Sequence, residues 1–328
     1  MTYNFKSSEI ENQIPHLVEK GITEFTVSDE KISRDKNRIL KIFNLMSQYA
    51  PEVFISIVVD VNLIDKDVIN AAGSLFSCLE IPLVAIEKGG KLLFDKKLYA
   101  KKARLLNDYG LVFGFLLTYA DSPADSLKLF LDRLDFATNQ YPNHIDFPQT
   151  ENVELEQTAK VSGAFSAKDI RYARDVSFGC RTFYSAGRAV TWMLSVLRPL
   201  KIHPSKFFAD FAEWQHCNNC DFKSGYVPEK ENHEDIEKMQ LLFLDEKYEE
   251  KSCKDLIPLV HDIVIINGAI SRVAGEGKES VIDVSYHPED LLGPESFDLI
   301  SFAENVCMMN CRVKIFETAD GPDFEILN

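Results

Sequence analysis

Residues 53–61 read VFISIVVDV, a short apolar run rich in β-branched residues that ends near an aspartate. Such a run predicts a β-strand. Four similar runs accompany it, and successive strands start 31, 26, 32 and 33 residues apart, close to the roughly 30 residues of one βα unit. The predicted strands begin near Ile22, Val53, Leu79, Leu111 and His144. The repetition predicts five parallel strands in an α/β domain.

Amphipathic helices are predicted between these strands. Asp65 and Asp95 stand at N-cap positions, and Gly21 and Gly110 stand where a left-handed residue lets a helix turn into the next strand. The first helix, over residues 8–20, has no strand before it, and neither a Gly-x-Gly-x-x-Gly fingerprint nor a Walker loop occurs. A doubly wound sheet and an open barrel both fit this pattern.

Beyond about residue 150 the pattern changes to longer helices. Helices are predicted over residues 166–197, 204–215, 233–248 and 255–264, followed by a β-hairpin of residues 312–317 and 323–327. The polar stretch 148–160 indicates a linker. We therefore predict an α/β domain over residues 1–150 and a mainly α-helical domain over residues 151–328 that ends in the hairpin.

Charge and composition exclude several classes of protein. The 328 residues include 36 basic and 51 acidic side chains, a net charge of −15 that disfavours binding to nucleic acid. No run approaches the roughly 18 consecutive apolar residues of a membrane span, and no export signal is visible. Seven cysteines, an odd number, do not fit a secreted disulfide framework, so a cytoplasmic protein is expected.

Several segments resemble one family in sequence order. Residues 21–29 (GITEFTVSD), 83–87 (LVAIE) and 114–118 (GFLLT) are similar to the second, fourth and fifth strands of radical S-adenosylmethionine (SAM) enzymes. Residues 204–214 (PSKFFADFAEW) resemble the helical C-terminal extension of the cobalamin-binding members. The resemblance implies an incomplete parallel βα barrel of the TIM type, followed by the helical domain.

The chain departs from this family at the cluster site. The family's Cys-x3-Cys-x2-Cys loop lies between its first strand and first helix, whereas this chain starts at that helix and has no cysteine before Cys78. The resemblance also implies a chain without the family's N-terminal cobalamin domain. Three thiolates hold the iron–sulfur cluster that binds SAM in the family, so the resemblance implies a chain without the usual cluster site.

Two cysteine pairs are candidate metal ligands. Cys217 and Cys220 have a chelating spacing, and Cys307 and Cys311 lie one helical turn apart. Four thiolates suffice for zinc or an iron–sulfur cluster, while buried or incidental thiols are the alternative. The remaining thiols are expected in the core or on the surface: Cys78, Cys180 and Cys253.

Polar residues also mark the carboxyl ends of the predicted strands, which carry the ligands in βα barrels. They are Asp29, Asp60, Glu87, Thr118 and Asp146. If SAM or another small molecule binds there, Asp60 and Glu87 are expected to accept hydrogen bonds from its hydroxyl or amino groups. The alternative is that these side chains cap the next helix or line a solvated rim.

Two functions follow from these observations. The first is a degenerate radical-SAM-like protein that acts as a binding or partner subunit, with a protein partner over the open sheet edge and a small molecule or peptide as its substrate. The second is an active radical SAM enzyme, whose cluster comes from a separate chain or sits on the four cysteines Cys217, Cys220, Cys307 and Cys311.

Overall fold

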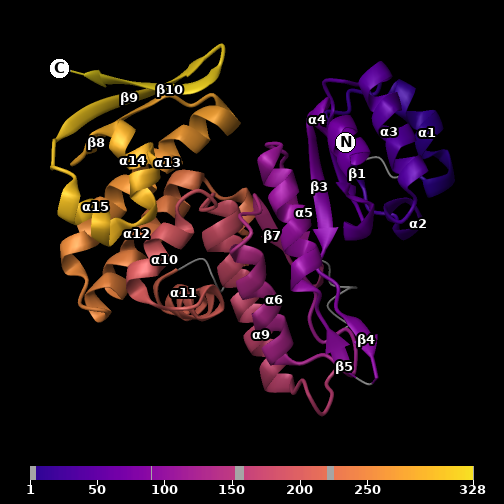
Figure 1. The fold of residues 1–328 in the computed structure, drawn as a ribbon, viewed down its shortest axis with the longest axis horizontal. Coiled ribbons are helices and arrows are strands. Elements are labelled where there is room, and N and C mark those ends of the chain that lie inside the picture. Colours follow the sequence, from indigo (N-terminus) through magenta and orange to yellow (C-terminus); the bar gives the residue numbers. More distant parts are fainter. Residues whose placement is uncertain (1–4, 90, 152–158, 220–224, 328) are drawn as a thin grey trace. The chain divides into compact units, whose positions relative to one another are not determined.

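The structure is a computed structural model that describes residues 5–89, 91–151, 159–219 and 225–327 (Figure 1). The chain divides into two compact units, Met1–Ser166 and Ala167–Asn328. The predicted linker, residues 148–160, begins with a short helix, α7 (Pro148–Glu151), and its residues 152–158 lie outside the described residues.

The N-terminal unit contains the predicted five-stranded parallel sheet. Its strands are β1 (Glu24–Val27), β2 (Phe54–Val58), β3 (Ser77–Pro82), β6 (Phe113–Leu116) and β7 (His144–Asp146). They pair in the order β1-β2-β3-β6-β7, and every pairing is parallel. In the part of the chain that the structure describes, β1 and β7 are the edges of an open sheet, so the predicted barrel is not confirmed.

Helices connect these strands as the spacing predicted. They are α2 (Glu30–Ser33), α3 (Lys36–Tyr49), α4 (Lys66–Gly73), α5 (Lys96–Asp108) and α6 (Leu127–Thr138), with the 3-10 turn η3 (Val61–Leu63). Asp65 accepts hydrogen bonds from the first turn of α4, and Asp95 does so for α5. Gly21 and Gly110 have φ angles of 65° and 66°, the left-handed backbone that the helix-to-strand turns require.

Two local predictions were wrong. The helix over residues 8–20 is split into η1 (Ser7–Glu9), α1 (Ile10–Gln13) and η2 (Ile14–His16), because Pro15 has no N–H for a continuous helix. The strand predicted to run on to Glu87 ends at Pro82. The N–H of Val84 does not join the sheet ladder; it donates to the Tyr99 hydroxyl at 3.0 Å and to the Pro82 carbonyl at 3.1 Å.

A small hairpin follows that strand. It consists of β4 (Ile86–Lys88) and β5 (Lys91–Leu93), which pair antiparallel.

One face of the parallel sheet is apolar and fully covered. Ile55, Ile57, Leu79, Phe113 and Phe115 point to this face and are at most 1% exposed. The residues that alternate with them point to the other face, because successive side chains of a strand point in opposite directions. The apolar alternation therefore fixes which residues share the second face.

The C-terminal unit is mainly α-helical. Its helices are α9 (Ala167–Cys180), α10 (Met193–Leu200), α11 (Pro204–Asn218), α12 (His233–Glu250), α13 (Ile257–Glu276), α14 (Pro288–Leu292) and α15 (Leu299–Asn305). Short helical turns are η4 (Arg181–Ala186), η6 (Pro228–Lys230), η7 (Lys254–Leu256) and η8 (Pro294–Phe297). The single helix predicted over residues 166–197 is thus interrupted. The aromatic rings of Phe183, Phe207, Phe211 and Phe243 form the core, with centroids of neighbouring rings 4.7–5.1 Å apart.

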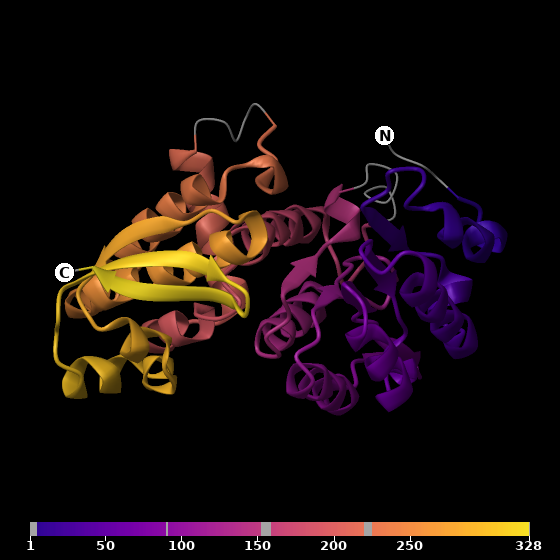
Figure 2. The same ribbon diagram turned by 90° about the horizontal axis from the view of Figure 1, so that it is seen from above.

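A three-stranded antiparallel sheet completes this unit. The predicted hairpin is confirmed as β9 (Cys311–Thr318) and β10 (Gly321–Leu327), and β8 (Ser280–Val284) adds a strand to β9 that the sequence reading missed. The sheet lies against α13 (Figure 2). The segment Lys254–Glu276, with a mean hydropathy of 1.5, is long and apolar enough to cross a membrane, contrary to expectation, but more than half of it is buried in the core.

Candidate functional site

The second face of the parallel sheet carries polar side chains. The strand alternation places there Ser56 of β2, Cys78 and Glu80 of β3, and His144 and Asp146 of β7. The register aligns Glu80, Gly114 and His144 in one row across β3, β6 and β7. Residues separated by more than 60 positions in the chain are therefore neighbours in the sheet.

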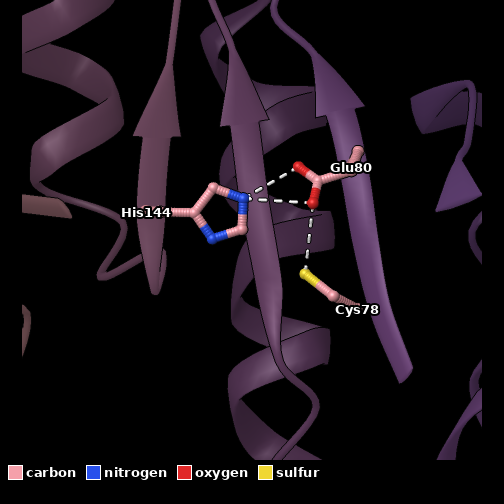
Figure 3. A group of neighbouring side chains, drawn as sticks. All are labelled: Cys78, Glu80 and His144. Carbon is pink, nitrogen blue, oxygen red and sulfur yellow. Dashed lines mark hydrogen bonds and ion pairs between the residues drawn. The ribbon is translucent and has the colours of Figure 1, made fainter. Parts of the chain in front are cut away.

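Gly114, which lies between Glu80 and His144 in this row, allows their side chains to come into contact. Figure 3 shows His144 reaching across the middle strand towards Glu80 and Cys78. A Cβ atom on Gly114 would lie only 2.0 Å from His144 Nε2, so the imidazole occupies the space that any other residue on β6 would fill. A glycine within a strand costs stability, and a close approach of this kind is a physical reason for one.

Glu80 is the centre of the cluster. His144 Nε2 donates to its carboxylate, 2.9 Å from Oε2 and 3.1 Å from Oε1. Ser56 Oγ donates to Oε1 at 3.0 Å, and the Cys78 thiol lies 3.4 Å from the same oxygen. Asp146 Oδ2 lies 3.7 Å from His144 Nε2. Three side chains from three strands thus contact one carboxylate, and Asp146 lies beside the histidine among them.

The electrostatics follow from this geometry. Burial by itself would raise the pKa of Glu80, but the hydrogen bond and charge of His144, together with Ser56 and Cys78, outweigh burial and lower that pKa. Burial and the neighbouring Glu80 carboxylate raise the pKa of the Cys78 thiol. Glu80 is therefore an ionised acceptor, and Cys78 is a neutral thiol that donates to it.

The cluster has the composition of a metal site. The ligand atoms of Cys78, Glu80 and His144 all lie within 4.8 Å of one another, and among the described residues theirs is the one group of three or more potential metal ligands that are this close. Sulfur, carboxylate oxygen and imidazole nitrogen are all ligands of zinc.

A pocket of about 590 Å³ lies at the carboxyl ends of β1, β2 and β3. Its lining residues include Ser28, Glu30, Arg34, Asp60, Asp95 and Tyr99. The Tyr99 hydroxyl donates to the carbonyl of Pro82 at 2.8 Å and accepts from Val84, which fixes one wall. The pocket therefore occupies the edge of the sheet where parallel α/β proteins bind ligands.

A buried arginine binds the backbone at the carboxyl ends of two strands of the parallel sheet. Arg133 of α6 is 3% exposed and donates to the carbonyls of Leu83 and Thr118, which follow β3 and β6. The Asp125 carboxylate lies 3.5 Å from its guanidinium. These contacts fix the ends of two strands and assign Arg133 a structural role.

The structure separates the predicted strand-end residues. Asp60 lines the pocket and accepts from the N–H of Asn62 at 2.8 Å, so it also caps η3. Asp29 caps α2 through the N–H groups of Lys31 and Ile32. Thr118 donates to Asp121 at 2.6 Å.

Glu87 and Asp146 lie in other surroundings. Glu87 is exposed on β4, opposite Leu92, and was wrongly placed at the end of a parallel strand. Asp146 is at the carboxyl end of β7 and contacts the polar cluster through His144.

The cysteines predicted as metal ligands all belong to the C-terminal unit. Cys217 is exposed at the end of α11, Cys307 is exposed after α15, and Cys311 is buried at the start of β9 with its thiol 3.1 Å from the Met309 carbonyl. Cys220 lies outside the described residues. A metal or cluster on these four thiols stays a prediction.

The sequence did not predict Glu80 or His144 as site residues. Cys78 was predicted to be a core thiol and is buried, at 2% exposed, but it also belongs to the polar cluster. The available signals were a carboxylate inside the apolar run of residues 77–82 and a glycine inside the strand of residues 113–116. Both are unusual for buried strands.

Comparisons with known proteins assign the chain to no family. No protein-family model matches it, and no curated protein does. Among solved structures, one similar chain is TsrM, a radical S-adenosylmethionine methyltransferase from Kitasatospora setae with cobalamin and a 4Fe-4S cluster bound. The TM-score is 0.34 at 10% identity, and the match covers 43% of this chain and 30% of that one, so this chain spans less than a third of that protein.

Proposed function

We propose that this chain is a binding protein whose N-terminal unit holds a small, positively charged molecule at the carboxyl ends of its parallel strands. The pocket of about 590 Å³ at β1–β3 is the observation that carries this proposal. Its volume falls within the roughly 300–1,000 Å³ of small-molecule sites. The radical SAM resemblance of the sequence supplies the probe, SAM, because it implies a ligand at the strand ends, where this pocket lies.

The charge of the pocket favours a cation. Glu30 and Arg34 pair with each other at 2.9 Å, and Asp60 and Asp95 add two further carboxylates to the lining. SAM carries a sulfonium and an ammonium against one carboxylate, so its net charge complements that lining. Ser28 and Tyr99 also line the pocket, and a serine hydroxyl suits a ribose because it both donates and accepts hydrogen bonds.

Isothermal titration of the full chain with SAM tests the proposal, with S-adenosylhomocysteine, which lacks the sulfonium charge, as the comparison. We expect saturable binding that is weaker for S-adenosylhomocysteine. Asp60→Asn should weaken SAM binding about tenfold, the loss of one hydrogen bond to a charged group, while asparagine still caps η3.

Asp35→Asn is the matched control. Asp35 caps α3 through the N–H of Arg38 and does not line the pocket, so this variant should bind SAM like the parent. The proposal fails if neither ligand binds, or if the two variants weaken SAM binding equally.

The second candidate is a subunit of a split radical SAM enzyme. Within the described residues, β1 and β7 each pair on one side only, so a partner chain that brings the cluster loop could add a strand to the sheet. An alternative version places the cluster on Cys217, Cys220, Cys307 and Cys311 of this chain.

Anaerobic reconstitution with iron and sulfide separates these versions. The binding protein and the split enzyme both predict that the chain alone stays colourless. A brown protein whose colour is lost on Cys217→Ala and Cys307→Ala would establish the relocated cluster instead.

A further inference from the structure

The polar cluster of Cys78, Glu80 and His144 does not line the strand-end pocket, and the proposed function does not use it. Its three ligand atoms are of three different kinds and come from two strands separated by β6. Cys78 and Glu80 are two residues apart on β3, so both point to the same face, and the register brings His144 to the level of Glu80.

The distances suit a tetrahedral cation. Bond lengths of about 2.3 Å to sulfur and 2.0–2.1 Å to nitrogen or oxygen separate neighbouring ligands by about 3.3–3.6 Å. The observed separations are 3.4 Å from Cys78 Sγ to Glu80 Oε1, and 2.9 Å and 3.1 Å from His144 Nε2 to the two oxygens of Glu80. The ligand atoms of Cys78 and His144 lie within 4.8 Å of one another. Moving His144 Nε2 away from Glu80 by a few tenths of an ångström would admit the ion between them.

We propose that Cys78, Glu80 and His144 form a binding site for a divalent transition-metal ion, with zinc as the expected occupant. On binding, the Cys78 thiol gives its proton to solvent and ligates as a thiolate. His144 gives up the Nε2 proton that it donates to Glu80, either to solvent or by tautomerisation to Nδ1, and ligates through Nε2 with its ring proton on Nδ1. Glu80 ligates as the carboxylate that it already is. Two negative ligands then neutralise the doubly charged cation.

The surroundings support this assignment. Ser56 donates to Glu80 at 3.0 Å and orients the carboxylate, as groups outside the ligand sphere of metal sites commonly do. Gly114 leaves the space above β6 open to the imidazole. Three protein ligands leave the fourth position of the ion for water or a ligand donor, the arrangement of catalytic rather than structural zinc sites.

Cobalt(II) is the probe for the test, because a thiolate–cobalt bond gives a charge-transfer band in the near ultraviolet. The full, untagged chain is freed of metal with a chelator and titrated with cobalt. We expect one equivalent to bind, the charge-transfer band to appear, and zinc to displace the cobalt and abolish the band.

Variants locate the ion. Cys78→Ser should remove the charge-transfer band, and His144→Gln should weaken cobalt binding by about tenfold or more. The control Cys217→Ser/Cys307→Ser, which alters two exposed thiols, should keep both the band and the affinity. If Cys78→Ser fails to fold by circular dichroism, the isosteric Glu80→Gln takes its place and should weaken cobalt binding.

Two results would overturn the proposal. The first is that cobalt does not bind in a one-to-one ratio. The second is that the charge-transfer band survives in Cys78→Ser and disappears in the control variant. The first result would leave Glu80 and His144 as a hydrogen-bonded pair, and the second would move the ion to the C-terminal unit. Neither result affects the test of SAM binding at Asp60, so the two proposals fail separately.

Discussion

Replacement of Gly114 by alanine tests whether the sheet positions His144 against Glu80. The added Cβ would lie 2.0 Å from His144 Nε2 and 2.5 Å from both Cδ2 and Cε1. An ordinary contact needs at least 3.4 Å, so the ring must retreat by about 1.4 Å. A retreat of that size breaks the 2.9 Å hydrogen bond to the Glu80 carboxylate.

The expected cost follows from two opposing terms. Loss of a hydrogen bond to a charged group costs about 1.5–3 kcal/mol, and alanine in place of a strand glycine regains about 0.5–1 kcal/mol. Gly114→Ala should therefore lower the free energy of unfolding by about 1–2 kcal/mol. In a His144→Ala background the obstructing ring is gone, and the same change should be neutral or stabilise by up to about 1 kcal/mol.

Urea denaturation of the four proteins of this cycle, followed by far-UV circular dichroism, measures the coupling between the two positions. Both tryptophans, Trp192 and Trp214, belong to the C-terminal unit, so tryptophan fluorescence follows that unit as a second probe. A coupling of about 1.5 kcal/mol or more is expected for residues in contact. Equal costs of Gly114→Ala in both backgrounds would refute the reasoning.

Three further predictions concern buried polar groups. Burial lowers the pKa of His233 to about 4, and its Nδ1 accepts from Arg272 at 3.0 Å. Because the unfolded chain takes up a proton near pH 6.5 and the folded chain does not, about 3 kcal/mol of stability should be lost as the pH falls from 6.5 to 4. In urea denaturation across this range, His233→Gln should remove that loss. Burial raises the pKa of Asp262 to about 6, above its unfolded value, so ionisation of this carboxyl destabilises the fold as the pH rises from 4 to 6. Asp262→Asn keeps an acceptor for the Ser285 N–H and should raise the free energy of unfolding at pH 7 by about 1–2 kcal/mol. An unchanged free energy of unfolding at pH 7 would contradict this. Tyr99→Phe removes the partner of two backbone groups at the end of β3 and should cost about 1–3 kcal/mol by urea denaturation, whereas an unchanged midpoint would show that water replaces the hydroxyl.

Local patterns predicted much of the fold. The run of residues 53–61 and its four counterparts predicted all five parallel strands, and Asp65, Asp95 and Gly110 marked helix ends that the structure confirms. Such signals depend on residues within a few positions of one another, so they can be read from sequence alone. Where a distant group intervened, as the Tyr99 hydroxyl does at Val84, the predicted element was wrong.

The sequence by itself determined the order and type of these elements and placed Asp60 at the carboxyl end of a strand. Only the tertiary structure decided that Cys78, Glu80 and His144 converge, because their meeting depends on which strands are neighbours and on their register. In a parallel sheet those neighbours are joined by helices, so the spacing of residues along the chain says little about their distance. Gly114 shows the reason most directly. In the sequence, this glycine indicates only a weak strand; in the sheet, its missing side chain leaves the space that the His144 ring occupies.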